Sequence, residues 1–340
     1  MTREKLESIS HEAGFDAVGV TLAVRAPHAE VFLDWVGEGC HATMDWLARD
    51  PERRCNPRLV LPGARSVIAL AMNYYHPDEP VADGAARGRI ARYARGRDYH
   101  HLIRKRLREF DRALAEEGGQ QKCFVDTGPI LERDFSALAG ISWHGKSTLA
   151  LHPQLGTWFF LAAVITTIEL EEPGSPMPAR CGKCTRCIDV CPTNAIVAPY
   201  KMDARRCISY WTIEHEGPLP KWIRPLLGDR IFGCDDCLDA CPWNRFAKIS
   251  READFSARKS SQLSLQEYLA LDEQAFRKLF EGSPVRRAGR QGFLRNVCTA
   301  LGNIGTSADL PALENTRLDD DPVISEHAAW AVGQISSRGK

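Results

Sequence analysis

A run of cysteines closed by proline constrains this chain more than any other feature. It has the pattern C-x2-C-x2-C-x3-C-P and consists of Cys181, Cys184, Cys187, Cys191 and Pro192. A shortened copy follows later in the chain: Cys234, Cys237, Cys241 and Pro242. The full pattern is the spacing with which bacterial ferredoxins bind 4Fe-4S clusters. In two-cluster ferredoxins the fourth cysteine of each run binds the other cluster, so we expect the two runs to fold around each other.

Eight cysteines in this region match the number of ligands that two 4Fe-4S clusters require. The shortened copy lacks a first cysteine, and Cys207, which lies between the two runs, can replace it. The predicted ligands of the first cluster are Cys181, Cys184, Cys187 and Cys241. Those of the second cluster are Cys191, Cys207, Cys234 and Cys237. This assignment leaves no cysteine of the region unused.

Two zinc sites with four cysteines each are the alternative interpretation. Zinc ribbons usually carry two separated C-x2-C pairs, rather than three cysteines followed by x3-C-P. The spacing therefore favours iron–sulfur clusters and electron transfer. The cysteines outside the motif are expected to be small buried hydrophobic residues: Cys40, Cys55, Cys123 and Cys298.

Composition limits the setting in which such a chain works. Its 340 residues suffice for two or three domains, and lysine plus arginine equals aspartate plus glutamate at 44 each. This balance argues against coating of nucleic acid or membrane by bulk charge, although a local basic patch is still possible. Residues 1–12 do not resemble a signal peptide, and residues 157–170 are too short and too polar to span a membrane. We therefore expect a cytoplasmic protein with no membrane association, whose cysteines are thiolate ligands rather than disulfides.

Alternating strand-like and helical segments before the cysteine region predict a mixed α+β fold. Strands are expected over residues 18–22, 66–75, 123–126 and 158–170. Helices are expected over residues 5–13, 31–35, 44–48, 101–117 and 131–139. No G-x-G-x-x-G motif follows any of these strands, so a Rossmann dinucleotide site is not supported.

Three domains are predicted, over residues 1–172, 173–250 and 251–340, with a Pro/Gly-rich linker at residues 171–178. The last domain contains an internal repeat: residues 300–304 (ALGNI) recur as residues 331–335 (AVGQI). Helix pairs with this offset are typical of a short HEAT-like array. Because an array with so few repeats is not stable alone, we expect it to pack on the cysteine domain.

Several segments spread over the chain share the motifs of one enzyme family. They include R-x2-P-x-L-x-L-P at residues 54–62, Y-x2-G-x-D-Y-H at 93–100, V-D-T-G at 125–128, A-G-I-x2-H-G-K at 139–146, G-x-W-F-F-L at 156–161, D-A-R-R-C-I-S-Y at 203–210, G-C-D-D-C at 233–237 and R-N at 295–296. In this order they resemble the epoxyqueuosine reductase family of tRNA-modifying enzymes. The chain departs from the family pattern at Ala42, Ser147 and Ala163.

The resemblance implies a fold and a reaction. It implies an N-terminal cobalamin-binding α/β domain like that of reductive dehalogenases, a ferredoxin-like domain with two 4Fe-4S clusters, and C-terminal HEAT-like helices that contact tRNA. The substrate would be a tRNA that carries epoxyqueuosine in its anticodon loop. Electrons would pass from an external donor of the flavodoxin or ferredoxin type through the clusters to cobalamin and then to the epoxide, giving queuosine. A monomer is expected.

Asp126 is the predicted catalytic residue, because the matching aspartate of the family is the proton donor. The reaction expels an oxygen that must be protonated, and a carboxylic acid can protonate it near neutral pH if burial raises its pKa. Taken without the resemblance, Asp126 in an Asp-x-Gly sequence after a strand is more simply a turn former. His100 is expected to lie at a helix N-terminus rather than to bind cobalt.

The resemblance also implies residues that contact the cofactor and the RNA. The predicted cobalamin contacts are Arg54, Ala91, Asp126, Ala150, Leu161 and Ser209. The predicted tRNA contacts are Arg286, Arg287, Arg290, Arg295 and Asn296. For each of these residues ordinary packing, or a solvated charged face, is the alternative. Two other functions remain open from the sequence: a corrinoid reductive dehalogenase-like enzyme acting on a small molecule, and a ferredoxin-type electron carrier.

Overall fold

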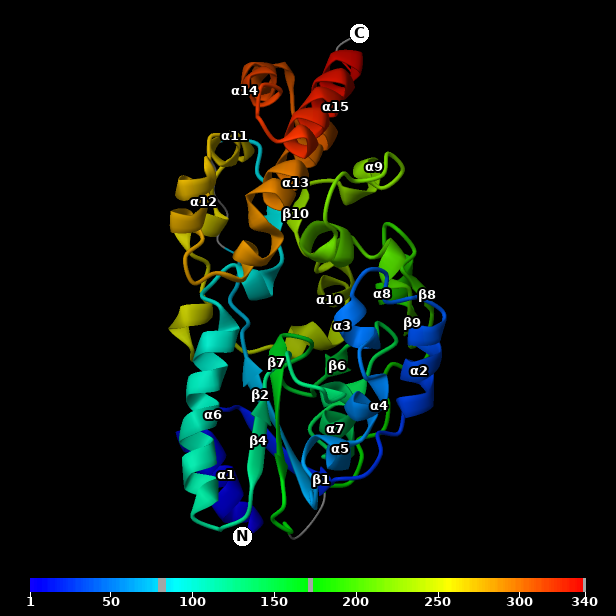
Figure 1. The fold of residues 1–340 in the computed structure, drawn as a ribbon, viewed down its shortest axis with the longest axis vertical. Helices are drawn as coiled ribbons and strands as arrows, with labels where there is room; N and C mark the ends of the chain where they lie inside the picture. The colour runs from blue at the N-terminus through cyan, green and yellow to red at the C-terminus, as the bar shows by residue number, and fades with distance from the viewer. Residues whose placement is uncertain (79–83, 171–173, 339–340) are drawn as a thin grey trace.

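A four-stranded antiparallel sheet organises the N-terminal half of the computed structural model, which describes residues 1–78, 84–170 and 174–338 (Figure 1). In spatial order its strands are β1 (Ala17–Leu22), β2 (Ser66–Asn73), β7 (Phe159–Thr166) and β4 (Gln121–Phe124). All four predicted strands are confirmed, although three of them end earlier than predicted. Asp126 lies two residues beyond the end of β4 with a φ of 57°, in the turn that the Asp-x-Gly sequence favours.

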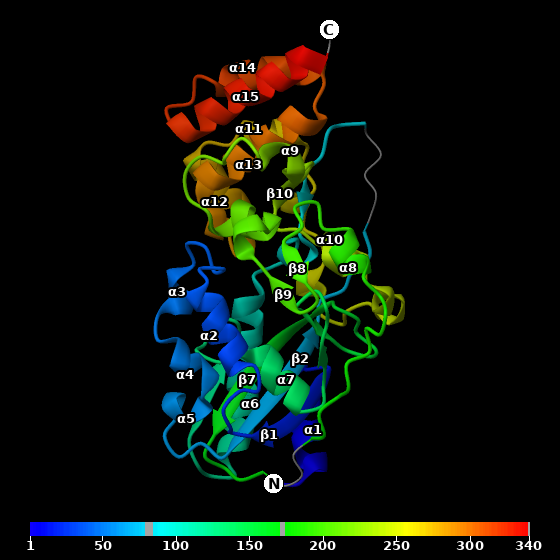
Figure 2. The ribbon, with the colours of Figure 1, turned by 90° about the vertical axis from the view of Figure 1, so that its right-hand side faces the viewer.

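Strand β2 is buried along its whole length because both faces of the sheet are covered by helices. Alternate residues of the strand therefore enter two different cores. Ile68, Leu70 and Met72 pack with α1 (Arg3–Glu12) and α6 (Tyr99–Ala115). On the opposite face, the small residues of β2 pack with α7 (Glu132–Leu138). The alternation gives the N-terminal half three layers, with the sheet in the middle (Figures 1 and 2).

Short elements surround the α7 face of the sheet and carry two of the family motifs, those at residues 54–62 and 139–146. The helices are α2 (Ala29–Gly37), α3 (Asp45–Ala48), α4 (Pro51–Cys55) and α5 (Pro57–Val60). A hairpin is formed by β5 (Trp143–His144) and β6 (Ala150–Leu151), which pair in antiparallel fashion. All five predicted helices are confirmed, with bounds that differ by a few residues.

The cysteine region follows as a set of short elements. They are α8 (Arg186–Asp189), β8 (Ile196–Ala198), β9 (Lys201–Met202), a π-helical turn (Tyr210–Glu214), α9 (Arg224–Leu227), β10 (Arg230–Phe232) and α10 (Asp236–Asp239). Strand β10 pairs in parallel with β3 (Arg89–Ile90), which comes from the N-terminal part of the chain. Residues 89–94 therefore cross into the neighbouring region, so the structural regions do not follow the sequence continuously. The predicted boundary at residue 172, and the start of the predicted linker, lie outside the described residues.

Helices make up the C-terminal part: α11 (Leu265–Leu269), α12 (Glu273–Leu279), α13 (Gly289–Ile304), α14 (Leu310–Thr316) and α15 (Pro322–Arg338). Their core includes Phe276, Phe280 and Phe293, and it also contains Ile231 and Phe232 of β10. The predicted packing of these helices against the cysteine region is thus confirmed. In the parts of the chain that the structure describes, no helix combines the length and apolar character needed to cross a membrane.

The two glycines of the internal repeat have different surroundings. A Cβ atom placed on Gly302 would lie 2.3 Å from the ring of Trp330 and 3.1 Å from the Cα atom of Ala331. A Cβ atom on Gly333 would meet no atom within 4 Å. Gly302 therefore permits the close approach of α13 and α15, whereas Gly333, its counterpart in the repeat, faces open space.

We predict that Gly302→Ala destabilises the protein by about 2 kcal/mol, because the added methyl group forces α13 and α15 apart. Gly333→Ala is the matched control, and it is expected to be neutral or stabilising because alanine favours a helix over glycine. The unfolding midpoint in urea measures both effects. Equal midpoints for the two variants would contradict the close-packing role of Gly302.

Candidate active site and cluster-binding region

The cysteines of the motif are all free thiols, and they gather in the two groups that the spacing predicts. Burial raises the pKa of the Cys241 thiol, and the nearby Cys181, Cys187 and Cys184 raise it further. Cys241 is thus brought from the second run to the first three cysteines of the first run. This is the first predicted ligand set.

The second predicted set gathers in the same way. Burial raises the pKa of Cys237 well above its ordinary value, and Cys207, Cys234 and Cys191 add to the effect. Cys207, the replacement for the missing ferredoxin cysteine, therefore lies with the group to which it was assigned. Burial raises the pKa of the Cys207 thiol, and hydrogen bonds from the backbone N–H groups of Ser209 and Tyr210 and from the Ser209 hydroxyl oppose this rise in part.

The spacing of the sulfur atoms bears on the choice between clusters and zinc. Four thiolates around one zinc ion lie about 3.8 Å apart, given zinc–sulfur bonds of about 2.3 Å. Among the described residues, no three cysteines converge tightly enough to hold a single ion. The cysteine groups thus lack the close convergence of a single-zinc site, and the C-x2-C-x2-C-x3-C-P spacing favours 4Fe-4S clusters.

The β5–β6 hairpin connects the first cysteine group to the N-terminal half. The Lys146 ammonium, in the loop of this hairpin, donates hydrogen bonds to the carbonyl oxygens of Gly182 (2.7 Å) and Cys184 (3.0 Å). Trp143 packs edge-to-face on Trp243, which follows Cys241 and Pro242. The same hairpin lines a cavity together with Cys181, Cys184, Cys187 and Cys241. The motif H-G-K therefore lies where the cluster region meets the sheet domain.

Asp126 lies on the surface of the N-terminal half with its side chain 62% exposed. The Tyr99 hydroxyl donates a hydrogen bond to its Oδ2 atom at 2.5 Å, and His100 Nε2 lies 3.5 Å from the same oxygen. His100 is in the first turn of α6, as expected, and its Nδ1 atom is held at 2.8 Å by Asp98. Asp126 is thus an accessible carboxylate with two groups that can pass protons to it.

The expected pKa shift of Asp126 is wrong in direction. The surrounding protein opposes ionisation, but hydrogen bonding to His100 and Tyr99 and the charge of Arg287 prevail, so the pKa of Asp126 is lowered. The pKa of His100 changes in the complementary sense: burial lowers it, but Asp126 and Asp98 raise it to about 9. Near neutral pH the proton therefore resides on His100, and Asp126 is an anion.

Glu132 is the protonated carboxyl group of this site, and the sequence offered no signal for it. It lies at the start of α7, where its Oε1 atom accepts a hydrogen bond of 2.9 Å from the Asp126 backbone N–H. Burial raises the pKa of Glu132 to about 8, with a further contribution from the Asp126 carboxylate. The hydrogen bond holds the loop that carries Asp126, which makes Glu132 a positioning residue.

The predicted cobalamin contacts lie in several parts of the structure, and of the residues other than Asp126 itself only Arg54 is shown near Asp126. Arg54 donates from Nη1 to the Gly128 carbonyl oxygen at 2.9 Å, while its Nε atom is buried without a partner. Ala150 and Leu161 belong to one hydrophobic cluster on the α7 face of the sheet. Ala91 donates its N–H to the Phe232 carbonyl oxygen beside the second cysteine group.

A buried polar atom without a partner is consistent with a polar ligand in this region. The Nε atom of Arg54, whose guanidinium lies near Asp126, is buried and has no hydrogen-bond partner. Such atoms are rare in folded proteins unless a ligand or water satisfies them. The residues present are therefore compatible with a corrinoid cofactor.

Two of the predicted tRNA contacts are wrong. The side chain of Arg295 is 1% exposed and that of Asn296 is fully buried, so neither reaches a phosphate. Arg295 donates instead to the backbone carbonyl oxygens of Trp211, His215 and Gly217, at 2.7 to 2.9 Å. A charged residue in an arginine-rich segment looks the same in sequence whether it faces solvent or fills the interior.

The other three arginines differ in accessibility. Arg290 is 18% exposed and is paired with Asp319. Arg286 is exposed, and Arg287 is 54% exposed and forms a bidentate pair with Glu214 at 2.7 Å. Arg287 also lies over the ring of Trp46, 5.1 Å from its centroid, and close enough to Asp126 to lower its pKa. Among the predicted RNA contacts, Arg287 is therefore the residue that lies near Asp126, the predicted proton donor.

Comparisons with known proteins agree with this arrangement. Residues 54–127 match the family model described as epoxyqueuosine reductase QueG, DUF1730, and residues 180–244 match the 4Fe-4S double cluster binding domain. The chain is 42% identical to the epoxyqueuosine reductase of Xanthomonas campestris pv. campestris, over 97% of this chain and 95% of the relative. It is 41% identical to that of Escherichia coli K12, over 98% of this chain and 90% of the relative.

Solved structures of epoxyqueuosine reductases also match this chain. A crystal structure of epoxyqueuosine reductase with an epoxyqueuosine-modified tRNA-Tyr stem loop superposes with a TM-score of 0.92 at 31% identity, and the match covers 98% of this chain and 90% of that chain. The likeness to a catabolic reductive dehalogenase is much weaker, with a TM-score of 0.42 at 14% identity. The mixed α/β fold is thereby established, whereas the resemblance of the N-terminal domain to reductive dehalogenases stays a prediction.

We predict that Glu132→Gln becomes more stable relative to the wild type as pH rises from about 5 to 8. The wild-type folded state holds a proton on Glu132 up to about pH 8, whereas the unfolded chain releases it near the ordinary glutamate pKa of about 4.5. Wild-type stability must therefore fall across this window, and a glutamine, which does not titrate, escapes the loss.

Urea midpoints of both proteins at unit intervals from pH 5 to pH 9 measure this difference. Glu109→Gln, which changes an exposed glutamate on α6, serves as the matched control. A stability difference between Glu132→Gln and wild type that stays constant with pH would contradict the protonated state of Glu132.

Proposed function

This chain belongs to the epoxyqueuosine reductase family, and on that premise we propose that it reduces epoxyqueuosine to queuosine at the wobble position of tRNA. One observation carries the proposal at the level of residues: an exposed carboxylate, Asp126, with Tyr99 and His100 in contact, in a chain whose residues 180–244 match a double-cluster domain. We infer that Asp126 is the proton donor of the reaction.

The chemistry defines what the site residues have to do. Conversion of the epoxide to a carbon–carbon double bond releases its oxygen as water and consumes two electrons and two protons. The protein must deliver a proton to the departing oxygen, because an unprotonated oxygen is a poor leaving group. Asp126 is anionic at rest, so it delivers a proton that His100 supplies. In this assignment Asp126 is the catalytic residue, while His100 and Tyr99 reload and orient it.

The electrons require cofactors. Two 4Fe-4S clusters, held by Cys181, Cys184, Cys187 and Cys241 and by Cys191, Cys207, Cys234 and Cys237, supply electrons one at a time. Cobalamin, when bound, supplies a low-valent cobalt that reduces the epoxide. Arg54, Ala91, Asp126, Ala150, Leu161 and Ser209 are the residues that we assign to hold it. The neighbourhood of Ser209 and Cys207 supports a short path between the second cluster and the cofactor.

RNA recognition is assigned to the exposed arginines near Asp126. Arg287 pairs with Glu214 and lies over Trp46, so it joins the C-terminal helices to the N-terminal half on the side where Asp126 is exposed. A phosphate or a flipped base at this place would meet a cation and an aromatic ring. Arg286, exposed beside it, adds a second positive charge.

Other parts of the proposal follow from this function. We propose that the C-terminal helices form a HEAT-like array that supports the anticodon arm of the tRNA. We also propose that the protein is a cytoplasmic monomer and that it takes electrons from a flavodoxin or ferredoxin. No observation favours a small-molecule dehalogenase or a simple electron carrier. The relatives that match along nearly the whole chain carry the name epoxyqueuosine reductase instead.

We predict that Asp126→Asn lowers turnover by at least about 100-fold, because the amide cannot protonate the leaving oxygen. Conversion of an epoxyqueuosine-containing tRNA stem loop, followed by nucleoside mass spectrometry, measures the effect. Iron content and stem-loop affinity should stay at wild-type values. Asp254→Asn, which changes an exposed carboxylate paired with Arg97, is the control and should keep full activity. Wild-type turnover in Asp126→Asn would exclude the assignment.

We also predict that replacement of both Arg286 and Arg287 by glutamine weakens stem-loop binding. It should reduce the slope of log affinity against log salt by about 0.7 to 0.9 for each lost phosphate contact. Arg290→Gln is the matched control: its side chain pairs with Asp319, so the slope should not change. Binding measured by fluorescence anisotropy from about 50 to about 200 mM salt, a range over which phosphate contacts change affinity strongly, tests this. An unchanged slope in the double variant would refute the placement.

A further inference from the structure

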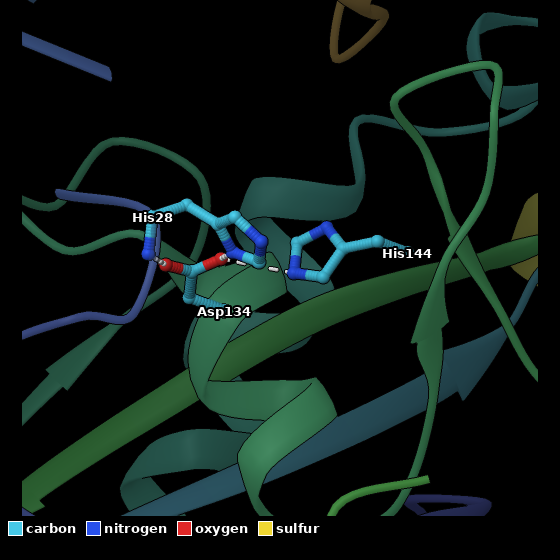
Figure 3. A group of neighbouring side chains, drawn as sticks. All are labelled: His28, Asp134 and His144. Atoms are coloured by element: carbon cyan, nitrogen blue, oxygen red, sulfur yellow. Dashed lines mark hydrogen bonds and ion pairs between the residues drawn. The ribbon is translucent and has the colours of Figure 1, made fainter. Parts of the chain in front are cut away.

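Two histidines and an aspartate converge beside α7 at a place that the proposed reaction does not use (Figure 3). They come from three separate segments: His28 precedes α2, Asp134 lies in α7, and His144 lies in β5. One nitrogen from each histidine and one carboxylate oxygen lie within 4.8 Å of one another. Among the described residues this is the group tight enough to hold a single metal ion.

Both histidines approach the same oxygen of Asp134. His28 Nδ1 lies 2.8 Å from Oδ1, and His144 Nε2 lies 2.9 Å from Oδ1. Two ligands of one metal ion with bonds of about 2.05 Å are separated by about 2.9 Å in octahedral and about 3.3 Å in tetrahedral geometry. These two separations, of which that to His28 is also a hydrogen-bond distance, are close to those of neighbouring ligands on one ion, and the two histidine nitrogens lie within 4.8 Å of each other.

The contact between His144 and Asp134 is close but poorly directed for a hydrogen bond. The Nε2 atom of His144 is buried and has no hydrogen-bond partner, although Asp134 Oδ1 is only 2.9 Å away. The bonding direction of Nε2 is therefore not aimed along the line to Oδ1, as for two ligands that bind one ion lying off the line between them. A buried nitrogen without a partner calls for one, and a cation bound by both atoms would supply it.

The residues around the three side chains fix the Asp134 carboxylate and leave His28 open to solvent. The other oxygen of Asp134, Oδ2, accepts a hydrogen bond of 2.9 Å from the His28 backbone N–H, which fixes the carboxylate. Asp134 is 4% exposed, whereas the side chain of His28 is 55% exposed and leaves an entry path from solvent. The neighbouring Arg133 directs its guanidinium to the Thr148 carbonyl oxygen, so it is bound elsewhere.

We propose that His28, Asp134 and His144 form a binding site for a divalent first-row transition-metal ion, with zinc as its simplest occupant. Two imidazole nitrogens and one carboxylate are the ligand types that zinc and ferrous sites share, and they leave positions open for water. The bound ion ties the segment before α2 and the β5–β6 hairpin to α7. This site is separate from the cluster cysteines, and it stands whether or not the proposed function is correct.

The test is zinc binding by the full-length protein with both clusters in place. Isothermal titration with zinc chloride, after dialysis against a chelator and confirmation of the iron content, should reveal one site with micromolar or stronger affinity. His28→Ala should weaken binding at least about tenfold, since it removes one of three ligands. His11→Ala, which changes an exposed histidine of α1 outside the site, is the matched control and should bind as the wild type does.

Two further readouts separate a metal site from a set of hydrogen bonds. Zinc should raise the melting temperature of the wild type and of His11→Ala, but not that of His28→Ala. Binding at pH 6 should be weaker than at pH 7.5, because the imidazoles must be deprotonated to bind. The absence of zinc binding, or equal zinc affinity in His28→Ala and wild type, would overturn the proposal.

Discussion

The buried Arg295 guanidinium is the interaction on which the arrangement of the cluster region depends. From α13 it reaches the backbone carbonyl oxygens of Trp211, His215 and Gly217, which belong to the π-helical turn after Cys207 and the residues that follow it. Asn296 adds hydrogen bonds to the carbonyl oxygens of Thr212 and Ile231. Irregular backbone of this kind leaves carbonyl groups without helical partners, and buried carbonyl groups are costly unless they are paired.

This arrangement costs free energy, because the buried guanidinium carries a positive charge and has no carboxylate partner. Burial lowers the pKa of Arg295 to about 10, which shows how strongly the interior opposes its charge. Its hydrogen bonds to backbone dipoles offset that penalty and lock the segment from Cys207 to Glu214 against the C-terminal helices. The position of Cys207, and of Ser209 beside it, is therefore set by a residue almost ninety positions later in the chain.

The acid site depends on a different physical device, the division of charge among neighbouring titratable groups. Asp126 keeps a lowered pKa because His100 and Tyr99 hydrogen-bond to its ionised form. Glu132, half-buried beside that negative charge, is held neutral. Two carboxyl groups linked by one backbone hydrogen bond thus have opposite protonation states at neutral pH. Such a separation is typical of sites that transfer protons.

The sequence by itself determined the chemistry-bearing residues that are recognised by spacing. The two cysteine groups, the strands of the sheet and Asp126 after a strand all follow from local patterns, because ligand spacing and side-chain alternation are properties of neighbouring residues. The tertiary structure decided what depends on distant partners. Burial turned Arg295 and Asn296 from expected RNA contacts into internal supports, and hydrogen bonding reversed the expected pKa shift of Asp126. It also brought His28, Asp134 and His144 together from three segments, which no spacing along the chain reveals because their proximity exists only in the folded protein.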